Sequence, residues 1–226
     1  ASRALGPATA KIFRIKYSIP VASIRAHLIP IVLQKLRTAF PQFVPGDNIF
    51  KTSFDNIGAI FHPALCVLNA GWSENDAAFQ FYAAGVSASV AKVLEAVDAE
   101  RVQVAAALGI RALTAREWLY LAYGAAGENL FLAMKANPGY RGIMAPQTLH
   151  MRYLHEDVPT SLVPIASVGR KFGVDTPAIR SVIQLSSALT GRDYWAEGRT
   201  VERLGIADLD LRSLRLLAIG ESGGAR

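Results

Sequence analysis

Apolar residues recur every three to four positions over most of the chain beyond residue 24, which is the spacing of one face of an α-helix. The longest such segment covers residues 85–108 and is followed by Gly109, a residue suited to helix termination. At about 1.5 Å per residue this helix would be about 35 Å long, so we expect it to form the spine of the domain. Asp98, Glu100 and Arg101 are predicted to lie on its solvated face and to pair locally. Its apolar stripe is formed by Val90, Leu94, Val97, Val104 and Leu108.

Further helices are predicted where apolar spacing is bounded by proline, glycine or a capping residue. Their ranges are residues 27–40, 53–71, 114–123, 128–135, a segment that begins near Pro159, 177–189 and 208–219. Thr114 and Glu117 have the spacing of a capping box. Pro63 is expected to break or kink the helix over residues 53–71 because it lacks a backbone donor. Residues 43–52 are predicted to form a loop or a short extended segment.

Residues 8–23 depart from the helical pattern and are predicted to form two short strands. Ile12, Arg14 and Lys16 would lie on one side of the first strand, with Phe13 and Ile15 on the other. Two strands alone are marginally stable, and no later segment supplies several more, so the predicted sheet is incomplete. The expected fold class is therefore mainly α: one domain of seven to nine helices, preceded by two short β-strands.

The composition agrees with a globular domain that has a sizeable core. Of the 226 residues, 51% are hydrophobic and only 19% are charged. No run approaches the roughly 18 uninterrupted apolar residues of a membrane span. The single cysteine, Cys66, excludes an internal disulfide and fits a reducing compartment. We therefore expect a cytoplasmic protein that does not contact a membrane.

The net charge of +6 arises at the N-terminal end, where seven basic residues precede the first acid, Asp47. These cations alternate with apolar residues and do not cluster on a helix. The sequence has no zinc-finger, helix-turn-helix or aromatic RNA-binding motif, so we expect no nucleic-acid partner. An anionic cofactor or a neighbouring acidic surface explains the imbalance better.

His62 is the most distinctive candidate for chemistry because it lies in the otherwise apolar segment GAIFHPALCVLNAG. On a helix it would share a thin polar stripe with Asp55, Gly58, Cys66 and Asn69. Two interpretations stay open at this point. His62 is either a core histidine satisfied by hydrogen bonds, or a general acid/base, since histidine titrates near neutral pH. Cys66 is expected to be a packing residue.

Charged residues crowd together in the segment RYLHEDVP, directly before an apolar helix. Asp157 would either hold the His62 imidazole in one tautomer or cap the following helix. Arg152 would either bind a substrate carboxylate through two parallel hydrogen bonds or pair with Glu156 or Asp157. The four histidines lack metal-ligand spacing, so no metal site is predicted.

Phosphate-binding and nucleophile motifs are missing from the sequence. It contains neither G-x-G-x-x-G nor G-x-x-x-x-G-K-[ST], and it has no G-x-S-x-G elbow. A dinucleotide used by this protein would therefore be held largely by another part of it.

With these residues in view, the sequence resembles the octopine/nopaline (opine) dehydrogenase family over nearly its whole length. The resemblance rests on GPATAKIFRIKYSIPVA, FHPALCVLNAG, SVAKVLEAVDAER, RYLHEDVPTSLVPIASVG and DYWAEGRTVERLG. It implies a helical catalytic domain over residues 26–226, similar to the C-terminal domain of 6-phosphogluconate dehydrogenase. Residues 1–25 would be the last strands of an otherwise missing Rossmann domain, present in cis or supplied in trans. This explains the incomplete sheet.

The resemblance also implies an NAD- or NADP-dependent oxidoreductase that condenses an amino acid with a 2-oxo acid and reduces the imine. The isolated chain is expected to be inactive without a nucleotide-binding domain. Two alternatives stay open: reduction of a simple 2-oxo or 2-hydroxy acid, and a non-catalytic helical dimerisation fragment. A homodimer is compatible with each of these functions.

The family's functional positions can be transferred to this sequence where its motifs match. The catalytic pair matches His62 and Asp157. Many family members carry an asparagine four residues before that histidine, whereas this sequence has Gly58 there. The candidate substrate-binding residues are Arg152, Asn56 and Asn69.

Overall fold

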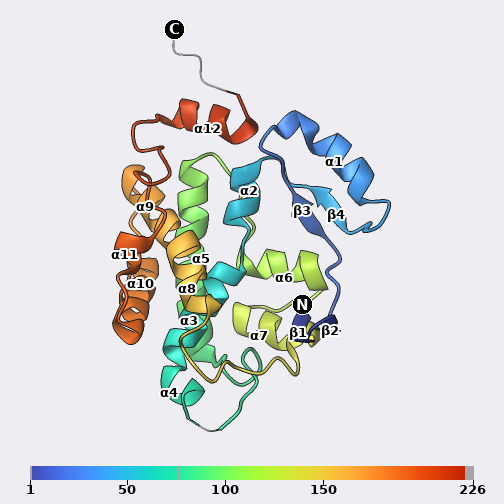
Figure 1. The fold of residues 1–226 in the computed structure, drawn as a ribbon, viewed down its shortest axis with the longest axis vertical. Coiled ribbons are helices and arrows are strands. Elements are labelled where there is room, and N and C mark those ends of the chain that lie inside the picture. The colour runs from blue at the N-terminus through green and yellow to red at the C-terminus, as the bar shows by residue number, and fades with distance from the viewer. Residues whose placement is uncertain (1, 76, 222–226) are drawn as a thin grey trace.

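A computed structural model describes residues 2–75 and 77–221 and confirms the mainly helical fold (Figure 1). The predicted spine is α5 (Ala88–Ala107), which runs through the middle of the molecule. The helices packed most extensively against it are α3 (Gly58–Leu68), α7 (Leu130–Ala136), α9 (Val163–Lys171) and α10 (Pro177–Thr190). The hydrophobic core therefore surrounds α5, whose apolar face is buried as predicted.

Shorter helical elements enclose this central group. They are η1 (Ala26–Leu28), α1 (Ile29–Leu36), α2 (Ile49–Phe54), α4 (Ala70–Ser73), α6 (Ala115–Tyr123), η2 (Pro138–Tyr140), α8 (Arg152–His155), η3 (Val158–Leu162), α11 (Tyr194–Glu197) and α12 (Leu211–Ile219). Thr114 and Glu117 form the predicted capping box at the start of α6. Gly191 adopts the left-handed conformation that ends α10, with φ of 67°. Among the helices described, none has the length and apolarity needed to cross a membrane.

The strands form two separate pairs at the N-terminal end. β1 (Ser2–Gly6) and β2 (Thr9–Ile12) are antiparallel, whereas β3 (Ile19–Val21) runs parallel to β4 (Phe43–Pro45). β2 and β3 lie within the segment predicted to form two strands. β2 ends at Ile12, however, so residues 13–16, which were expected to alternate along the first strand, are not part of a strand. β4 pairs in parallel with a strand more than twenty positions earlier, a partnership that local periodicity does not encode.

Several predicted helix boundaries need correction. Residues 43–52 were expected to contain no helix, but α2 begins at Ile49 because the Asn48 side chain accepts hydrogen bonds from the backbone N–H groups of Phe50 (3.0 Å) and Lys51 (3.1 Å). The helix predicted over residues 27–40 is limited to α1 and the preceding turn.

The segment predicted as one helix over residues 53–71 is divided, but the break lies before His62 and not at Pro63. The chain turns between α2 and α3 at Asp55–Ile57, and α3 then runs continuously through Pro63 to Leu68. Pro63 is buried on a helix that packs against α5 and α10. The neighbouring helices therefore hold α3 together despite the missing N–H donor.

The prediction that Asp98, Glu100 and Arg101 form a solvated face is wrong, because all three are buried. The predicted local pairing is confirmed, since Arg101 donates to Asp98 three residues earlier. Both oxygens of Glu100 accept from the first turn of α10, from the backbone N–H groups of Ala178 (2.7 Å) and Ile179 (2.8 Å). A carboxylate at a helix N-terminus satisfies donors that have no partner within the helix. These contacts join segments 78 and 79 residues apart, so no local pattern indicated them.

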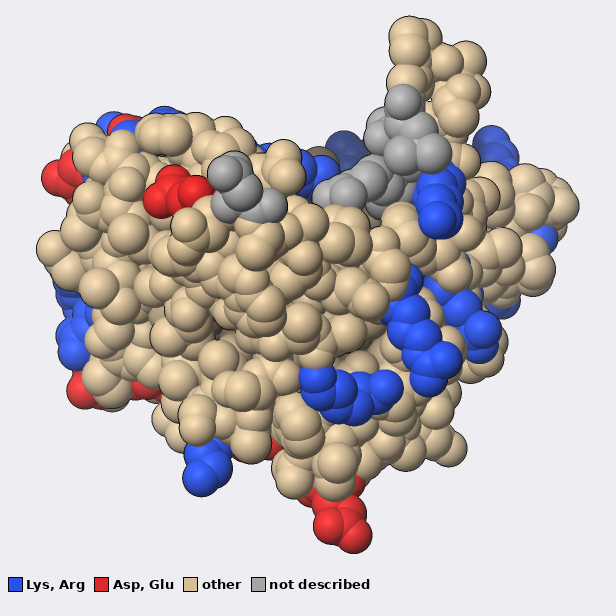
Figure 2. Space-filling model, turned by 90° about the horizontal axis from the view of Figure 1, so that it is seen from below, with Lys and Arg blue, Asp and Glu red and all other residues tan. Residues whose placement is uncertain are grey.

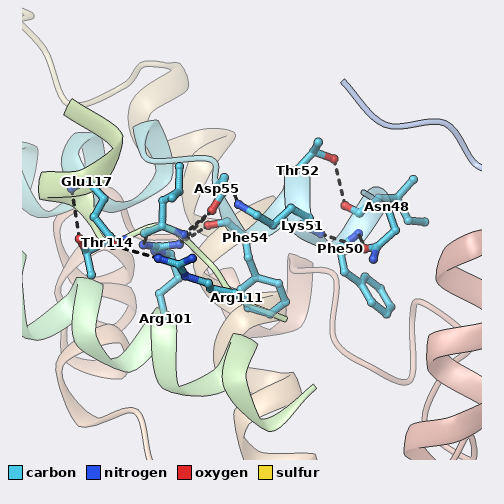
Figure 3. Close-up of polar contacts among 12 residues, drawn as sticks. Asn48, Phe50, Lys51, Thr52, Phe54, Asp55, Arg101, Arg111, Thr114 and Glu117 are labelled. Atoms are coloured by element: carbon cyan, nitrogen blue, oxygen red, sulfur yellow. Dashed lines mark hydrogen bonds and ion pairs between the residues drawn. The ribbon is translucent and has the colours of Figure 1, made fainter. Parts of the chain in front are cut away.

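Arg101 is the centre of a buried ionic cluster that joins α2, α5 and the start of α6 (Figure 3). Its guanidinium donates to Oδ1 of Asp98 through Nε (3.1 Å) and Nη2 (2.6 Å), and to the carbonyl oxygens of Phe54 and Leu113. Oδ1 of Asp55 lies 4.0 Å from Nη1 of Arg101 and accepts from the N–H of Leu113 at 2.8 Å. Asp55 also forms an ion pair with Lys51. The cluster thereby fixes the corner from which α3 starts.

Candidate active site

A cleft of about 1210 Å³ lies between the N-terminal segment, the corner between α2 and α3, and the segment around α8. Its wall is largely apolar and aromatic. Besides His62, the charged residues that line it are Lys16, Asp55, Arg152 and Arg199. Asp55 is already paired with Lys51 and accepts from a backbone N–H. The remaining charged residues that line the described part of the cleft are cations, so the cleft favours the binding of anions.

His62 and Asp157 meet at this cleft although 95 residues separate them. His62 lies in the second turn of α3, and Asp157 directly precedes η3, which packs against α3 together with α8. Nδ1 of His62 is 2.7 Å from Oδ2 of Asp157, and the two side chains are 16% and 11% exposed. Asp157 makes no side-chain cap on η3, so the capping alternative finds no support. With Nδ1 bonded to the carboxylate, Nε2 is left for proton exchange.

Tyr153 holds the face of the same imidazole. Its ring stacks on His62 with centroids 4.0 Å apart and planes inclined by 15°. Phe81 stacks on Tyr153 at 5.5 Å, and Tyr82 lies at a tilt 6.3 Å from His62. The imidazole is thus restrained at its edge by Asp157 and on its face by Tyr153. The motif RYLHEDVP contained Tyr153, but only the packing of α8 against α3 brings it to the histidine.

The other predicted substrate-binding residues occupy different surroundings. Arg152 lines the cleft, and its Nε is 3.9 Å from Oε2 of Glu156, an exposed contact that contributes little stability. Asn56 is exposed and also lines the cleft. The structure does not bring Asn69 there, because its amide donates to the carbonyls of Leu65 (3.0 Å) and Gly85 (3.1 Å) and joins the end of α3 to the segment before α5.

Cys66 is fully buried one turn after His62. Burial, reinforced by the negative charge of Asp157, raises the pKa of the Cys66 thiol to about 12. The thiol therefore stays protonated at neutral pH and packs as predicted. No cluster of three or more metal-ligating side chains occurs among the described residues.

Gly58 lies one turn before His62, and its lack of a side chain lets the imidazole approach the backbone closely. A Cβ added at Gly58 would be 3.1 Å from Cε1 and 3.4 Å from Nδ1 of His62, and 3.4 Å from Oδ1 of Asn56. Contacts this short force a neighbour to move by a few tenths of an ångström. The absence of a side chain here therefore permits the observed imidazole position.

Replacing Gly58 with Ala is expected to lower kcat/KM of the complete enzyme by about 3- to 10-fold, because a displaced catalytic group loses alignment steeply with distance. Steady-state kinetics would measure the effect. The matched control is Gly71→Ala, since a Cβ added at Gly71 meets nothing within 4 Å. Equal kcat/KM values for the two variants would contradict the prediction.

Two features of the cleft were not predicted as functional from the sequence: Tyr153 as a support for His62, and Lys16 as a cleft residue. The alternation of cations in the first strand placed Lys16 only on one side of it. Figure 2 shows one group of lysine and arginine side chains on the right of the face drawn, while other basic side chains lie near acidic ones on its left.

Comparison with known proteins gives a consistent set of matches. The family model described as "NAD/NADP octopine/nopaline dehydrogenase, alpha-helical domain" matches residues 45–190. The chain is 36% identical over 209 residues to an opine dehydrogenase of Arthrobacter sp. (strain 1C), covering 92% of this chain and 58% of that protein. It is 29% identical over 155 residues to vitopine synthase of Allorhizobium ampelinum, covering 68% of this chain and 43% of that protein. The chain thus spans about half the length of these relatives.

Solved structures of octopine dehydrogenase share the fold. A complex with NADH and L-arginine superposes with a TM-score of 0.68 at 21% identity, covering 86% of this chain and 55% of the other. A complex with NADH and pyruvate gives a TM-score of 0.64 at the same identity. These structural matches confirm the helical fold. The match over residues 45–190 and the 36% identity to the Arthrobacter enzyme show that the chain belongs to the NAD/NADP octopine/nopaline dehydrogenase family, of which it contains the alpha-helical domain.

Proposed function

We propose that this chain carries the substrate-binding and proton-transfer residues of an enzyme that condenses an amino acid with a 2-oxo acid and reduces the product. The observation that carries the proposal is the 2.7 Å contact between His62 and Asp157 at an anion-favouring cleft, in a chain of this family. The amine and the carbonyl lose water to form an imine. Hydride addition at its carbon and protonation at its nitrogen then give a secondary amine.

His62 is the residue that we assign to proton transfer. Asp157 accepts from Nδ1–H and holds the imidazole in one tautomer, while Tyr153 restrains the plane of the ring. Nε2 would exchange a proton with the carbonyl oxygen during condensation and supply one to the nitrogen during reduction. General acid/base catalysis of this kind contributes roughly 10²–10⁴-fold. Arg152 would bind the carboxylate of the 2-oxo acid beside this pair.

The nicotinamide dinucleotide, when bound, supplies the hydride. Among the described residues no glycine-rich turn joins a strand to a helix in the way that holds a pyrophosphate. We therefore assign its binding to sequence that the relatives carry beyond the span matched here. Residues 1–25 are interpreted as the last strands of that nucleotide-binding domain, which would complete the sheet begun by β3 and β4.

The proposal is tested by assaying the complete enzyme with NADH or NADPH, pyruvate and a panel of amino acids, with mass spectrometry of the product. We expect dinucleotide oxidation to require both the amino acid and the 2-oxo acid and to yield an N-(carboxyalkyl) amino acid. Oxidation with pyruvate alone would instead favour reduction of a simple 2-oxo acid. Absence of turnover with every pair would favour the non-catalytic alternative.

A further inference from the structure

Lys16 lies in the segment between β2 and β3 and reaches the same cleft as His62 from a different wall. The backbone N–H of Tyr17 donates to the carbonyl of Ala122 at 2.8 Å, and Arg14 donates to the hydroxyl of Tyr17. Ala122 belongs to the last turn of α6. The segment is therefore attached to the helical body, so the position of Lys16 relative to the cleft is well defined.

The surroundings of Lys16 are aromatic. Its ammonium lies 4.8 Å from the ring centroid of Trp118, which packs edge-on against Tyr123 at 5.5 Å. Both rings line the cleft together with Phe13 and Tyr140. A cation over an aromatic face is stabilised by the ring, and a wall that excludes water strengthens its attraction for an anion.

No carboxylate among the described residues forms an ion pair with Lys16. Burial lowers the pKa of its amine, as expected for an ammonium that has lost part of its hydration. The other cations of the cleft differ from it: Arg152 already lies near Glu156, and Arg199 is exposed. Lys16 thus combines partial burial with a charge that nothing described in this chain neutralises.

We propose that Lys16 binds a carboxylate of the amino acid substrate. The inference rests on the proposed function, in which the reaction joins two molecules that each carry a carboxylate. Arg152, in the same segment as Asp157, is assigned to the 2-oxo acid, so the second carboxylate needs a second cation. Lys16 supplies it from the segment between β2 and β3, and the aromatic residues beside it would contact the amino acid side chain.

The test is Lys16→Met in the complete enzyme, with KM measured separately for the amino acid, pyruvate and the dinucleotide. Loss of one charge-assisted contact is expected to raise the KM for the amino acid by about 10- to 100-fold. The KM values for pyruvate and the dinucleotide should stay within about 2-fold. Lys16→Arg should restore part of the affinity, because it retains the cation.

A matched control separates a local contact from the general field of the protein. Lys92→Met removes the same charge from an exposed position on α5 that does not line the cleft, and it should leave all three KM values unchanged. A panel of L-alanine, L-leucine and L-glutamate shows whether Lys16 binds the α-carboxylate of the amino acid or a carboxylate on its side chain. An equal rise for all three amino acids identifies the α-carboxylate, and a rise for glutamate alone identifies the side chain.

Three outcomes would overturn the proposal: an unchanged KM for the amino acid, a rise confined to the dinucleotide, which would indicate a phosphate contact, or an equal rise in Lys92→Met. Should Lys16→Met fail to fold, acetylation of Lys16 by N-hydroxysuccinimide acetate in the wild-type enzyme provides a second readout. We expect the amino acid to protect Lys16 but not Lys92, and lack of protection would also overturn the proposal. A wild-type enzyme that condenses no amino acid would contradict the proposed function, a result distinct from all of these.

Discussion

Replacing His62 with Gln in the complete enzyme is expected to lower kcat for reductive condensation by roughly 10²–10⁴-fold. Glutamine retains a polar side chain of similar reach but cannot exchange a proton near neutral pH. Its amide can still donate to Asp157, so the environment of the buried carboxylate is preserved. Single-turnover and steady-state kinetics with saturating substrates would measure the loss. KM should change much less than kcat, because the lost interaction acts on the transition state.

The matched control for this variant is His27→Gln, since His27 is exposed and does not line the cleft. A second arm combines His62→Gln with Asp157→Asn. If Asp157 acts through the imidazole, the double variant should be no slower than His62→Gln alone within a few-fold. Full activity of His62→Gln, or losses that add independently in the double variant, would refute the assignment.

Replacing Arg101 with Met is expected to lower the free energy of unfolding by about 3–5 kcal/mol, because one partner of a buried ionic cluster is removed. Asp98 would keep a charge in the core without its guanidinium partner, and the carbonyls of Phe54 and Leu113 would lose their donors. Arg101 is 0% exposed, so water cannot take its place without a rearrangement. Urea unfolding followed by circular dichroism would measure the change.

Arg111 provides the control for this prediction (Figure 3). Its contact with Glu117 is 3.7 Å long and highly exposed, so Arg111→Met should cost less than about 1 kcal/mol. Arg101→Lys should fall between the two, because a lysine keeps the charge but cannot reach all three acceptors. A loss for Arg101→Met no larger than that for Arg111→Met would show that the cluster contributes little to stability.

The two sets of experiments concern connected parts of the molecule. The cluster around Arg101 fixes Asp55 at the corner between α2 and α3, and α3 carries His62 seven residues later. A displacement of this corner would therefore shift the start of α3 and, with it, the position of His62 relative to Asp157. Measuring kcat for Arg101→Lys beside its stability separates the two effects, since a purely global loss leaves the activity of the folded fraction unchanged.

Local patterns were sufficient for the helical class, the spine and several helix ends. Apolar spacing over residues 85–108 predicted α5, and Thr114, Glu117 and Gly191 mark ends of α6 and α10 through contacts within one turn. The family resemblance was likewise contained in short motifs. These features follow from interactions between residues a few positions apart, which a sequence displays directly.

Only the tertiary structure decided which polar residues are buried, and which of them meet. The sequence placed Asp98, Glu100 and Arg101 on a solvated face, because the backbone groups that they bind, such as the carbonyl of Phe54 and the N–H of Ala178, lie far away along the chain. It suggested His62 and Asp157 as a pair, but their 2.7 Å contact and the stacking of Tyr153 depend on α8 and η3 packing against α3. Lys16 became a cleft residue only through the contact of its segment with α6. In each case the free energy of the side chain depends on neighbours that packing brings close. Those neighbours are distant in sequence, so the local periodicity of apolar residues does not identify them.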